Sequence, residues 1–557
     1  MAALPPRGWW GIDRWLAVTL IVAAFCCAHG LQWGRVECWN RDQMALRDLR
    51  GLKPRSFTKP PFHTYVNHLL VLTPIRLVER TASAIGGAKV EFHHVRLLGS
   101  RLLVVTMFLG TIALGYTCAR RFYGEFAARF VAVFLGTSAT FVAYAHFLSV
   151  DSPLLFWMLA VFFFAERIVR VGELRDYVWA GLLTGLCAAT KYNGIAVGIA
   201  IPVAHLFSEN CRSFRSCVVA KPLLVGVAMV PAGFILGNPF AVLNHRRFVA
   251  DFMYNYIVTP AYSGETGTGY GEFLRRIPEI LGWPGAMVVG FGVLASAVLV
   301  LRRARGDRHA LAGFCIAAAV ALLYFAKIGA FARMPTRFAL PAVPFLILMA
   351  APVVEALRSR AALVSLLLAP VVVYNVVCSA WVGQRFNSDP RMAAQEWILA
   401  HVPSGSTIES SACSPRWSKL RGLQAVEINA AKPEWSKRKA RQTVDLRLPV
   451  VNNRFELFGR IFQGNRWIEG ERHREGVPEL ELFSAAGLAQ RNPDFICVHS
   501  LDYAADNPVV QSYYGDLLAE RLPYTAVFDG TTPAAPWFVY PRTIDFLDGR
   551  MTIVQRR

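Results

Sequence analysis

Two acidic and several basic residues have the types and positions needed to transfer a group from a phosphate-linked donor. A carboxylate can take the proton from an attacking hydroxyl, and fixed cations can stabilise the charge that grows on a leaving phosphate. The planar fork of arginine matches phosphate oxygens well. The candidate acids are Asp42 and Asp151, and the candidate phosphate-binding cations are Lys59, Lys191, Arg246 and Arg337.

The composition indicates that membrane helices position these residues. The 557-residue chain is 54% hydrophobic and only 17% charged, with a mean hydropathy of +0.36. Several runs approach the roughly 20 apolar residues that cross a bilayer. The formal charge of +21 lies largely in arginines of short loops between these runs, as the positive-inside rule predicts. This pattern indicates a lipid bilayer as partner and no nucleic acid, which would need a basic patch on a soluble domain.

The alternation of arginine-rich and arginine-poor loops predicts about eleven transmembrane helices within residues 1–382. Arg7 and Arg14 precede the first apolar run. They place the N-terminus inside and a long loop, residues 34–95, outside. Asp42 and Asp151 are then both expected on the outer face. Residues 383–557 have a soluble composition and are expected to form an extracytoplasmic α/β domain.

Local patterns predict several elements in more detail. The apolar stretch 177–205 is interrupted by Lys191-Tyr192-Asn193-Gly194, which predicts a pair of short helices with a turn at the outer face. In the soluble part, we expect a helix over 391–401 and strands over 494–498 and 524–528. The Asp548-Gly549 dipeptide predicts a hairpin between 544–546 and 551–554.

The cysteines and histidines show no metal-binding spacing. Of the eleven cysteines, Cys211 and Cys217 fall in a basic loop that we place in the cytoplasm. On the outer side, a disulfide between Cys413 and Cys497 is one possibility. The histidines of the first outer loop are expected to be hydrogen-bonded interfacial residues rather than metal ligands. They are His63, His68, His93 and His94.

Each candidate site residue also has a purely structural interpretation. Asp151 before Ser152-Pro153 can serve as a helix cap. Lys191 can extend along the helix to the membrane surface. Arg333 and Arg337 can be ordinary loop charges. Their shared position on one face favours a functional site.

The order of motifs resembles a known family. After Asp42 come Phe57-x-Lys-Pro-Pro, Asp151-Ser-Pro, Gly181-Leu-x-x-Gly-Leu-x-x-x-x-Lys-Tyr, Asn238-Pro-Phe and Arg337-Phe-Ala-Leu-Pro-x-x-Pro. This order is similar to that of membrane glycosyltransferases of the GT-C fold. Within that fold, it resembles the family 39 enzymes that include protein O-mannosyltransferases and lipid A aminoarabinose transferases. The resemblance covers Trp15 to about Trp381.

The resemblance implies transfer of a sugar, with inversion, from a polyprenyl-phosphate carrier to an acceptor outside the cytoplasmic membrane. Asp42 matches the catalytic acid of the first outer loop, and Asp151 the acid of the second. Lys59 matches the lysine before Pro-Pro, and Lys191 the lysine of the broken helix pair. We expect Lys59, Lys191, Arg246 and Arg337 to bind the donor phosphate. Many relatives have Asp-Glu where this chain has Asp42-Gln43, and the aminoarabinose branch has Glu-Lys-Pro where this chain has Thr58-Lys59-Pro60. The second difference argues against an aminoarabinose donor.

The sequence leaves the metal, the acceptor and two rival functions open. A divalent cation, Mg²⁺ or Mn²⁺, would be held by Asp42 and Asp151. The sugar and the acceptor, whether protein, lipid or glycan hydroxyl, are not specified. A lipid-linked sugar flippase or a non-catalytic assembly subunit is the alternative. The expected location is the inner membrane of a bacterium, with the active site and the C-terminal domain on the extracytoplasmic side.

Overall fold

The structure is a computed structural model. It describes residues 13–34, 53–54, 56–86, 92–258, 269–303, 306–331, 334–403, 406–410, 424–427, 483–500, 508–544, 547 and 549–557. These residues form two compact units. The helical unit takes the described residues of Met1–Leu31, Met44–Gln384 and Ala535–Arg542. The C-terminal unit takes those of Gln32–Gln43, Arg385–Ala534 and Thr543–Arg557.

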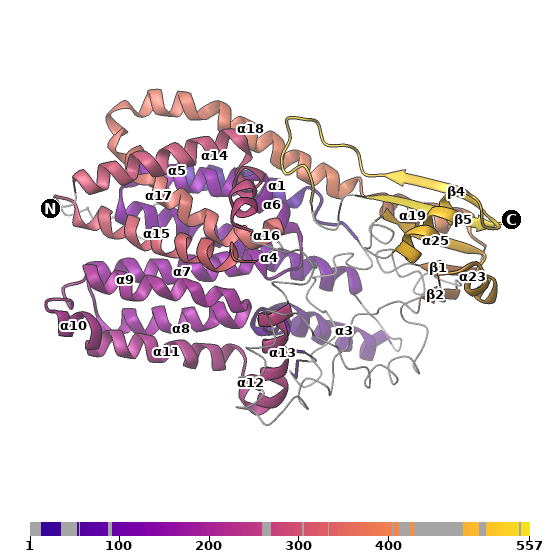
Figure 1. The fold of residues 1–557 in the computed structure, drawn as a ribbon, viewed down its shortest axis with the longest axis horizontal. Coiled ribbons are helices and arrows are strands. Elements are labelled where there is room, and N and C mark those ends of the chain that lie inside the picture. The colour runs from indigo at the N-terminus through magenta and orange to yellow at the C-terminus, as the bar shows by residue number, and fades with distance from the viewer. Residues whose placement is uncertain are drawn as a thin grey trace. The chain divides into compact units, whose positions relative to one another are not determined.

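The helical unit contains long apolar helices joined by short ones (Figure 1). Its first half contains α1 (Arg14–Ala28), α2 (Phe62–Asn67), the π-helix η2 (His68–Leu72), α3 (Thr73–Gly86), α4 (His93–Phe122), α5 (Glu125–Thr137), α6 (Ala139–His146), α7 (Asp151–Arg170) and α8 (Leu174–Thr190). Its second half contains the 3₁₀ helix η3 (Tyr192–Ile199), α9 (Ala200–Phe207), α10 (Phe214–Val219), α11 (Lys221–Gly237), α12 (Phe240–Leu243), α13 (His245–Val258), α14 (Tyr270–Arg302), α15 (Arg308–Ile328), α16 (Thr336–Ala339), η5 (Leu340–Ala342), α17 (Val343–Ala356), η6 (Arg358–Arg360) and α18 (Ala361–Asn387).

Within the described residues, seven helices are long and apolar enough to cross a membrane. Counting the bent pair Glu125–Thr137 and Ala139–His146 as one span gives eight. Two shorter apolar helices, Arg14–Ala28 and Tyr192–Phe207, accompany them. The predicted class, a polytopic helical membrane protein with a C-terminal α/β region, is confirmed. The count of eleven spans stays a prediction, because the remaining helices are shorter than the roughly 20 residues that a bilayer requires.

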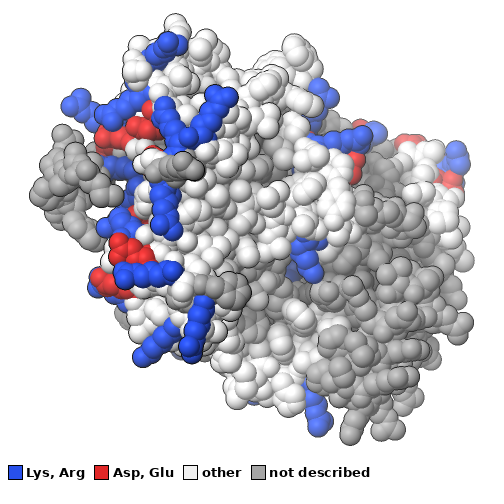
Figure 2. Space-filling view, turned by 60° about the vertical axis from the view of Figure 1, so that its left-hand side comes forward, with Lys and Arg blue, Asp and Glu red and all other residues white. Residues whose placement is uncertain are grey.

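Basic side chains gather at one end of the helical unit (Figure 2). Helices α4 and α7 end on arginine pairs there, and α15 begins there: the residues are Arg120, Arg121, Arg167, Arg170 and Arg308. Since α7 has 20 residues, its first residue, Asp151, lies about 30 Å from this basic end. The arrangement matches the predicted separation of Asp151 from the basic loops; Asp42 lies outside the described residues.

Helices α8 and α11 touch backbone to backbone through glycines. A Cβ added at Gly181 would stand 2.0 Å from the carbonyl oxygen of Gly226, and one at Gly233 would stand 2.1 Å from that of Leu182. Membrane helices commonly pack through small residues of this kind. The glycine motif that contributed to the family resemblance therefore has a packing role, and it holds the end of α8 that carries Lys191.

The C-terminal unit contains a five-stranded sheet in the order β2-β1-β3-β5-β4. Its strands are β1 (Thr407–Ser410), β2 (Gln424–Glu427), β3 (Phe495–His499), β4 (Tyr524–Thr531) and β5 (Arg550–Arg556), with helices α19 (Pro390–His401), α23 (Ala485–Arg491) and α25 (Pro508–Leu518). Strand β1 is parallel to β2 and β3, whereas β5 is antiparallel to β3 and β4. The predicted helix at 391–401 and strands at 494–498 and 524–528 are confirmed.

The predicted hairpin around Asp548-Gly549 is wrong. Strand β5 pairs with β4, and Thr531 is opposite Arg550. Ile544 belongs to no strand. The local turn signal was outweighed by the pairing of β5 with β4 on one side and with β3 on the other. Between β4 and β5, residues Ala535–Arg542 pack within the helical unit.

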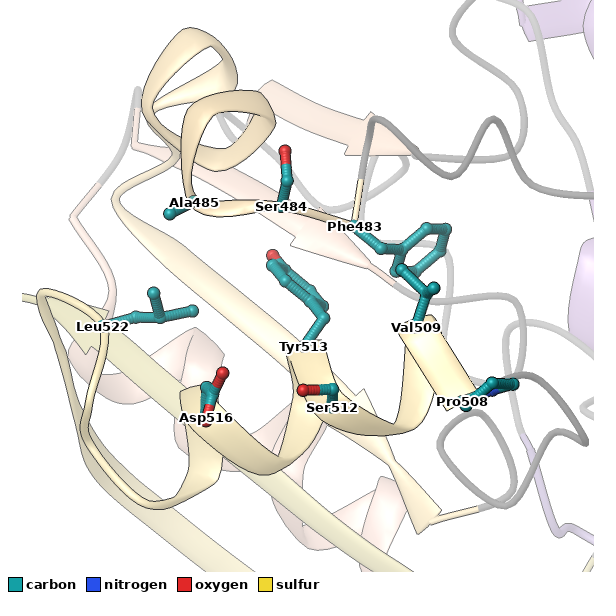
Figure 3. A pocket seen from close by; sticks show the side chains of 9 residues that line it. All are labelled: Phe483, Ser484, Ala485, Pro508, Val509, Ser512, Tyr513, Asp516 and Leu522. Atoms are coloured by element: carbon teal, nitrogen blue, oxygen red, sulfur yellow. The ribbon is translucent and has the colours of Figure 1, made fainter.

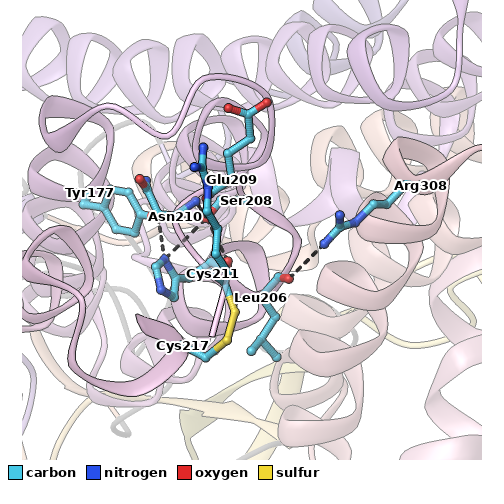
Figure 4. The surroundings of a disulfide bond; sticks show 10 residues. Tyr177, Leu206, Ser208, Glu209, Asn210, Cys211, Cys217 and Arg308 are labelled. Carbon is cyan, nitrogen blue, oxygen red and sulfur yellow. Dashed lines mark hydrogen bonds between the residues drawn. A yellow bond between two sulfur atoms is a disulfide. The ribbon is translucent and has the colours of Figure 1, made fainter. Parts of the chain in front are cut away.

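A disulfide joins Cys211 to Cys217 between α9 and α11 (Figure 4). Nearby, the Tyr177 hydroxyl and His205 Nδ1 lie 2.6 Å apart, and the Asn210 side chain donates to the Gly172 carbonyl. The sequence placed this loop in the cytoplasm, where disulfides are rare, so no bond between these two cysteines was expected. Cys413 lies outside the described residues, so its pairing with Cys497 stays a prediction.

Candidate functional site

The centre of the candidate site is an ion pair between Asp151 and Lys191. The Lys191 ammonium donates to Asp151 Oδ1 over 2.7 Å, and the two side chains are only 20% and 8% exposed. Asp151 begins α7, where the helix dipole favours a carboxylate. Lys191 is in an extended conformation between α8 and η3. The predicted break in the 177–205 stretch is thus present, and it brings the lysine to the acid.

The pair excludes the simpler structural interpretations of both residues. Val150 is the N-cap of α7 and receives no side-chain capping bond, so Asp151 is not a cap. Lys191 does not extend away to the membrane surface, because its ammonium is held by Asp151. An ammonium has three donors and Asp151 Oδ1 accepts one. Lys191 can therefore hold Asp151 and contact a phosphate oxygen at the same time.

The break between α8 and η3 has three consecutive residues, and each of them contacts a different segment. Lys191 pairs with α7 through Asp151, and the Tyr192 hydroxyl donates to the Phe57 carbonyl. The Asn193 carbonyl accepts from the Tyr324 hydroxyl of α15 over 2.8 Å. The break is consequently fixed from three sides, which preorganises Lys191.

Two of the predicted phosphate-binding cations lie near the same aromatic ring. The Lys191 ammonium is 5.5 Å from the centre of the Phe338 ring, and the Arg337 guanidinium is 5.9 Å from it. Each cation is attracted to the ring face. Phe338 is therefore a neighbour shared by both cations.

The segment that carries Lys59 is clamped between α13 and η3. The Asp251 carboxylate accepts from the Phe57 backbone N–H over 2.6 Å and from the Ser56 hydroxyl over 3.2 Å. Phe57 is buried against Phe248, and its carbonyl accepts from Tyr192. Lys59 itself is exposed and directly precedes the Pro60-Pro61 entry to α2. Tyr192 thus links the Lys59 loop to the residue next to Lys191.

Asp251→Ala should release the Lys59 loop and lower sugar transfer without unfolding the protein. Hydrogen bonds to a charged group contribute about 1.5–3 kcal/mol each, and Asp251 accepts two from this loop. Transfer rate and thermal unfolding in detergent measure the two effects. Glu272→Ala is the matched control, because the pairs it breaks, with Arg275 and Arg276, lie within α14. Unchanged transfer in Asp251→Ala would show that the clamp is irrelevant to activity.

The remaining predicted residues fall in different places. Arg246 is exposed on α13, whose Asp251 and Phe248 hold the Lys59 loop. Asp42 and Arg333 lie outside the described residues, so their roles stay predictions. The sequence reasoning assigned no role to Asp251, Tyr192 or Phe338. The only available signal was that each lies within or beside a motif or a basic cluster.

Several buried polar groups near the start of α2 have no partner within the described residues. They are both ring nitrogens of His63 and the side-chain amides of Asn67 and Asn238, all three residues being fully buried. The expectation that His63 is a hydrogen-bonded interfacial residue is therefore wrong. Burial lowers the pKa of His63 to about 3. Its ring is neutral at pH 7 and adds no positive charge for a phosphate.

Metal use stays a prediction. The described residues contain no group of three or more His, Cys, Asp and Glu side chains that could hold a metal ion. Asp151 is described and pairs with Lys191, whereas Asp42, the other predicted ligand, is not described.

A hollow of about 370 Å³ lies in the C-terminal unit (Figure 3). Its polar lining is used for local structure: the Ser484 hydroxyl accepts from Gly487 N–H at the start of α23, and Asp516 pairs with Arg521. The rest of the lining is largely apolar, including Phe483, Val509 and Leu522. The described carboxylate of the lining and one of its hydroxyls thus serve local structure.

The fold is that of a polytopic helical membrane protein, and one segment of the chain matches a glycosyltransferase family. Residues 90–235, about a quarter of the chain, match the family model described as dolichyl-phosphate-mannose-protein mannosyltransferase. The matched segment contains Asp151 and Lys191. The resemblance predicted from the motif order is confirmed. No curated protein matches the sequence significantly.

Solved structures with similar architecture share little sequence. ArnT from Cupriavidus metallidurans bound to undecaprenyl phosphate is 15% identical, with 97% of this chain and 98% of that chain covered and a TM-score of 0.49. The oligosaccharyltransferase of Archaeoglobus fulgidus is 12% identical over 96% and 75%, with a TM-score of 0.45. The Pmt1-Pmt2 protein O-mannosyltransferase complex of S. cerevisiae is 14% identical over 46% and 34%, with a TM-score of 0.30. At these scores, the similarities assign no substrate to this chain.

Proposed function

We propose that this glycosyltransferase moves a sugar from a polyprenyl-phosphate carrier to a hydroxyl acceptor by single displacement, with inversion. The observation that carries the proposal is the Asp151–Lys191 pair beside the Phe338–Arg337 contact. Lys191 would offer a leaving phosphate a compact positive charge, and Arg337 would offer it a planar set of N–H donors. Their charge would stabilise the transition state more than the bound donor.

The two carboxylates have different tasks in this proposal. Asp42 is the general base that takes the acceptor proton. Asp151 is pinned at the start of α7 and bound to Lys191, so it orients the lysine rather than attacking the sugar. A double displacement would need a carboxylate nucleophile within reach of the anomeric carbon. A divalent cation, if one is used, would bind to Asp42 and Asp151.

An apolar groove offers space for the hydrocarbon part of the carrier. It has a volume of about 310 Å³ and is lined by Pro74, Ile75 and Val78 of α3 and by Phe92 and Val95 at the start of α4. The chain reaches it from Lys59 through α2 and η2. Such a lining excludes water and favours an isoprenoid chain by the hydrophobic effect.

The proposed orientation puts the site on the extracytoplasmic side of the inner membrane. It rests on the separation of Asp151 from the arginine ends of α4 and α7. Basic residues flanking spans favour the cytoplasm. The acceptor is then a protein, lipid or glycan hydroxyl outside the cytoplasm.

Lys59→Ala and Arg337→Ala should each fold but transfer slowly. If each cation resembles an oxyanion-stabilising donor, the loss is roughly 10²–10³-fold in turnover with a small change in donor affinity. The test is transfer from a synthetic polyprenyl-phosphate sugar in detergent, beside Arg275→Ala as an exposed control on α14. Wild-type turnover in both variants would refute the phosphate-binding role and weaken the proposed function.

A further inference from the structure

A short C-terminal segment penetrates the helical unit. Tyr540 is buried, its hydroxyl donates to Asn375 Oδ1 of α18 over 2.7 Å, and its ring stacks on Tyr374 at 5.5 Å between centres. The Tyr374 hydroxyl in turn donates to the Phe538 carbonyl over 2.7 Å. Figure 1 shows the yellow chain after β4 running beside α18. The segment Pro536–Arg542 is called the strap below.

The Tyr540 side chain occupies a position where two other helices are interrupted. Its hydroxyl accepts from Ala139 N–H at the break between α5 and α6. Its ring also faces Gly282, a non-helical residue with φ of +68° inside α14, where an added Cβ would approach the ring to 2.6 Å. The strap is thus built into the membrane-spanning helices and does not merely rest on them.

The lengths of three helices indicate the depth of Tyr540 in the membrane. At about 1.5 Å per residue, Gly282 lies about 30 Å from the arginine end of α14 at Arg302. Ser138 lies about 20 Å from the start of α5, and Tyr374 about 20 Å from the start of α18. The hydrocarbon core is about 30 Å thick. Tyr540 therefore lies in the part of the core farthest from the basic end, between about two thirds of the way across and the boundary.

At this level, the strap exposes large aromatic side chains. Trp537 is 82% exposed and Phe538 44% exposed, and their rings are in edge contact. Trp283, next to Gly282, is 71% exposed. On the same helix as Tyr374, Val373 and Val377 are exposed too, as expected for a helix apolar enough to span the bilayer. Exposed Trp and Tyr are typical of the lipid headgroup level.

We propose that the strap is a membrane-interface anchor: Tyr540 fixes it in the helical unit, and Trp537 and Phe538 insert into the headgroup region of phospholipids. We expect phospholipid to contact these two rings, because Phe538 is bonded to Tyr374 of α18 and α18 exposes apolar side chains as a lipid-facing helix does. The Arg542 guanidinium donates to the Trp537 carbonyl and keeps a positive charge beside the rings, where lipid phosphates lie. The anchor does not rest on the proposed transfer activity.

The test is photo-crosslinking of the full chain in phospholipid nanodiscs, with p-benzoylphenylalanine at position 537 and lipid adducts read by intact mass. Position 291 on α14, where Phe291 is 71% exposed, is the lipid-facing control, and position 511 on α25 is the control in the C-terminal unit. We expect a phospholipid adduct at 537 with a yield like that at 291, and none at 511. A yield at 537 like that at 511, or an adduct with a second copy of the chain, would overturn the anchor.

A second variant tests the role of Tyr540. Tyr540→Ala in the 537 probe background should lose the lipid adduct at 537, while the same substitution in the 291 background should leave that adduct unchanged. Tyr540→Phe keeps the ring against Gly282 and should retain much of the yield. Unchanged crosslinking at 537 in Tyr540→Ala would show that Tyr540 does not hold the strap. Because the readout is lipid contact, failure of the anchor leaves the transfer proposal intact.

Discussion

Replacing Asp42 by asparagine is expected to lower sugar transfer by roughly 10²–10⁴-fold, the contribution usual for a positioned general base. Asparagine has nearly the same shape but cannot accept the proton of the acceptor hydroxyl. Expression, membrane insertion and donor binding should stay as in the wild type, because the substitution changes only the charge. Turnover with a synthetic polyprenyl-phosphate sugar and binding of the unreactive polyprenyl phosphate measure the two properties.

The next acid along the chain, Asp48, provides the matched control for this prediction. Asp48 is in the same loop by sequence, and Asp48→Asn removes an equal charge without touching the proposed base. Both positions lie outside the described residues, so the prediction rests on sequence order and the family resemblance. Full activity of Asp42→Asn, or equal losses in both variants, would remove Asp42 from the mechanism.

Lys191→Met is expected to reduce both activity and stability. Asp151 is buried against Lys191 at 2.7 Å, and removing one partner of a buried ion pair leaves an uncompensated charge. Such losses are about 3–5 kcal/mol, and we expect the lower part of the range because Lys191 is partly exposed. Transfer should fall as well, because a charge that stabilises the leaving phosphate is lost. Thermal unfolding in detergent and the transfer rate measure the two effects.

A double variant separates the two consequences of losing Lys191. Asp151→Asn with Lys191→Met removes both charges, so stability should return towards that of the wild type while transfer stays low. Asp151→Asn alone should keep measurable transfer, because Lys191 remains. If the double variant is as unstable as Lys191→Met, the ion pair is not the reason for the loss. Normal transfer in the double variant would exclude both residues from the site.

Much of the helical architecture could be predicted because the membrane limits the choices. Apolar runs must form helices in a bilayer, and arginine-rich loops mark their ends. The interruption at Lys191-Tyr192-Asn193-Gly194 was visible because polar residues stand inside an apolar stretch. The sequence placed Lys191 and Asp151 on one face, and the structure adds the contact between them.

The supporting contacts of the site could not be predicted from the sequence. The bond between Asp251 and the Phe57 backbone joins residues 194 positions apart. Nothing local in α13 marks Asp251 as the residue that holds the Lys59 loop. The sequence also offers Arg247, one turn earlier in α13, as an ion-pair partner, and the two side chains lie 3.8 Å apart. The wrong hairpin prediction has the same origin. Strand β5 pairs with β4, and the connection between the two strands includes the strap. Long-range pairing depends on the whole fold, whereas turn signals are local.

The most direct test of the central claim is the configuration of the product. The wild-type protein in detergent is given a synthetic polyprenyl-phosphate sugar of known anomeric configuration and a hydroxyl acceptor, and the product is read by NMR. Single displacement with Asp42 as base predicts a product of inverted configuration and release of polyprenyl phosphate. A product of retained configuration, or a sugar trapped on Asp151 and detected by peptide mass, would contradict it.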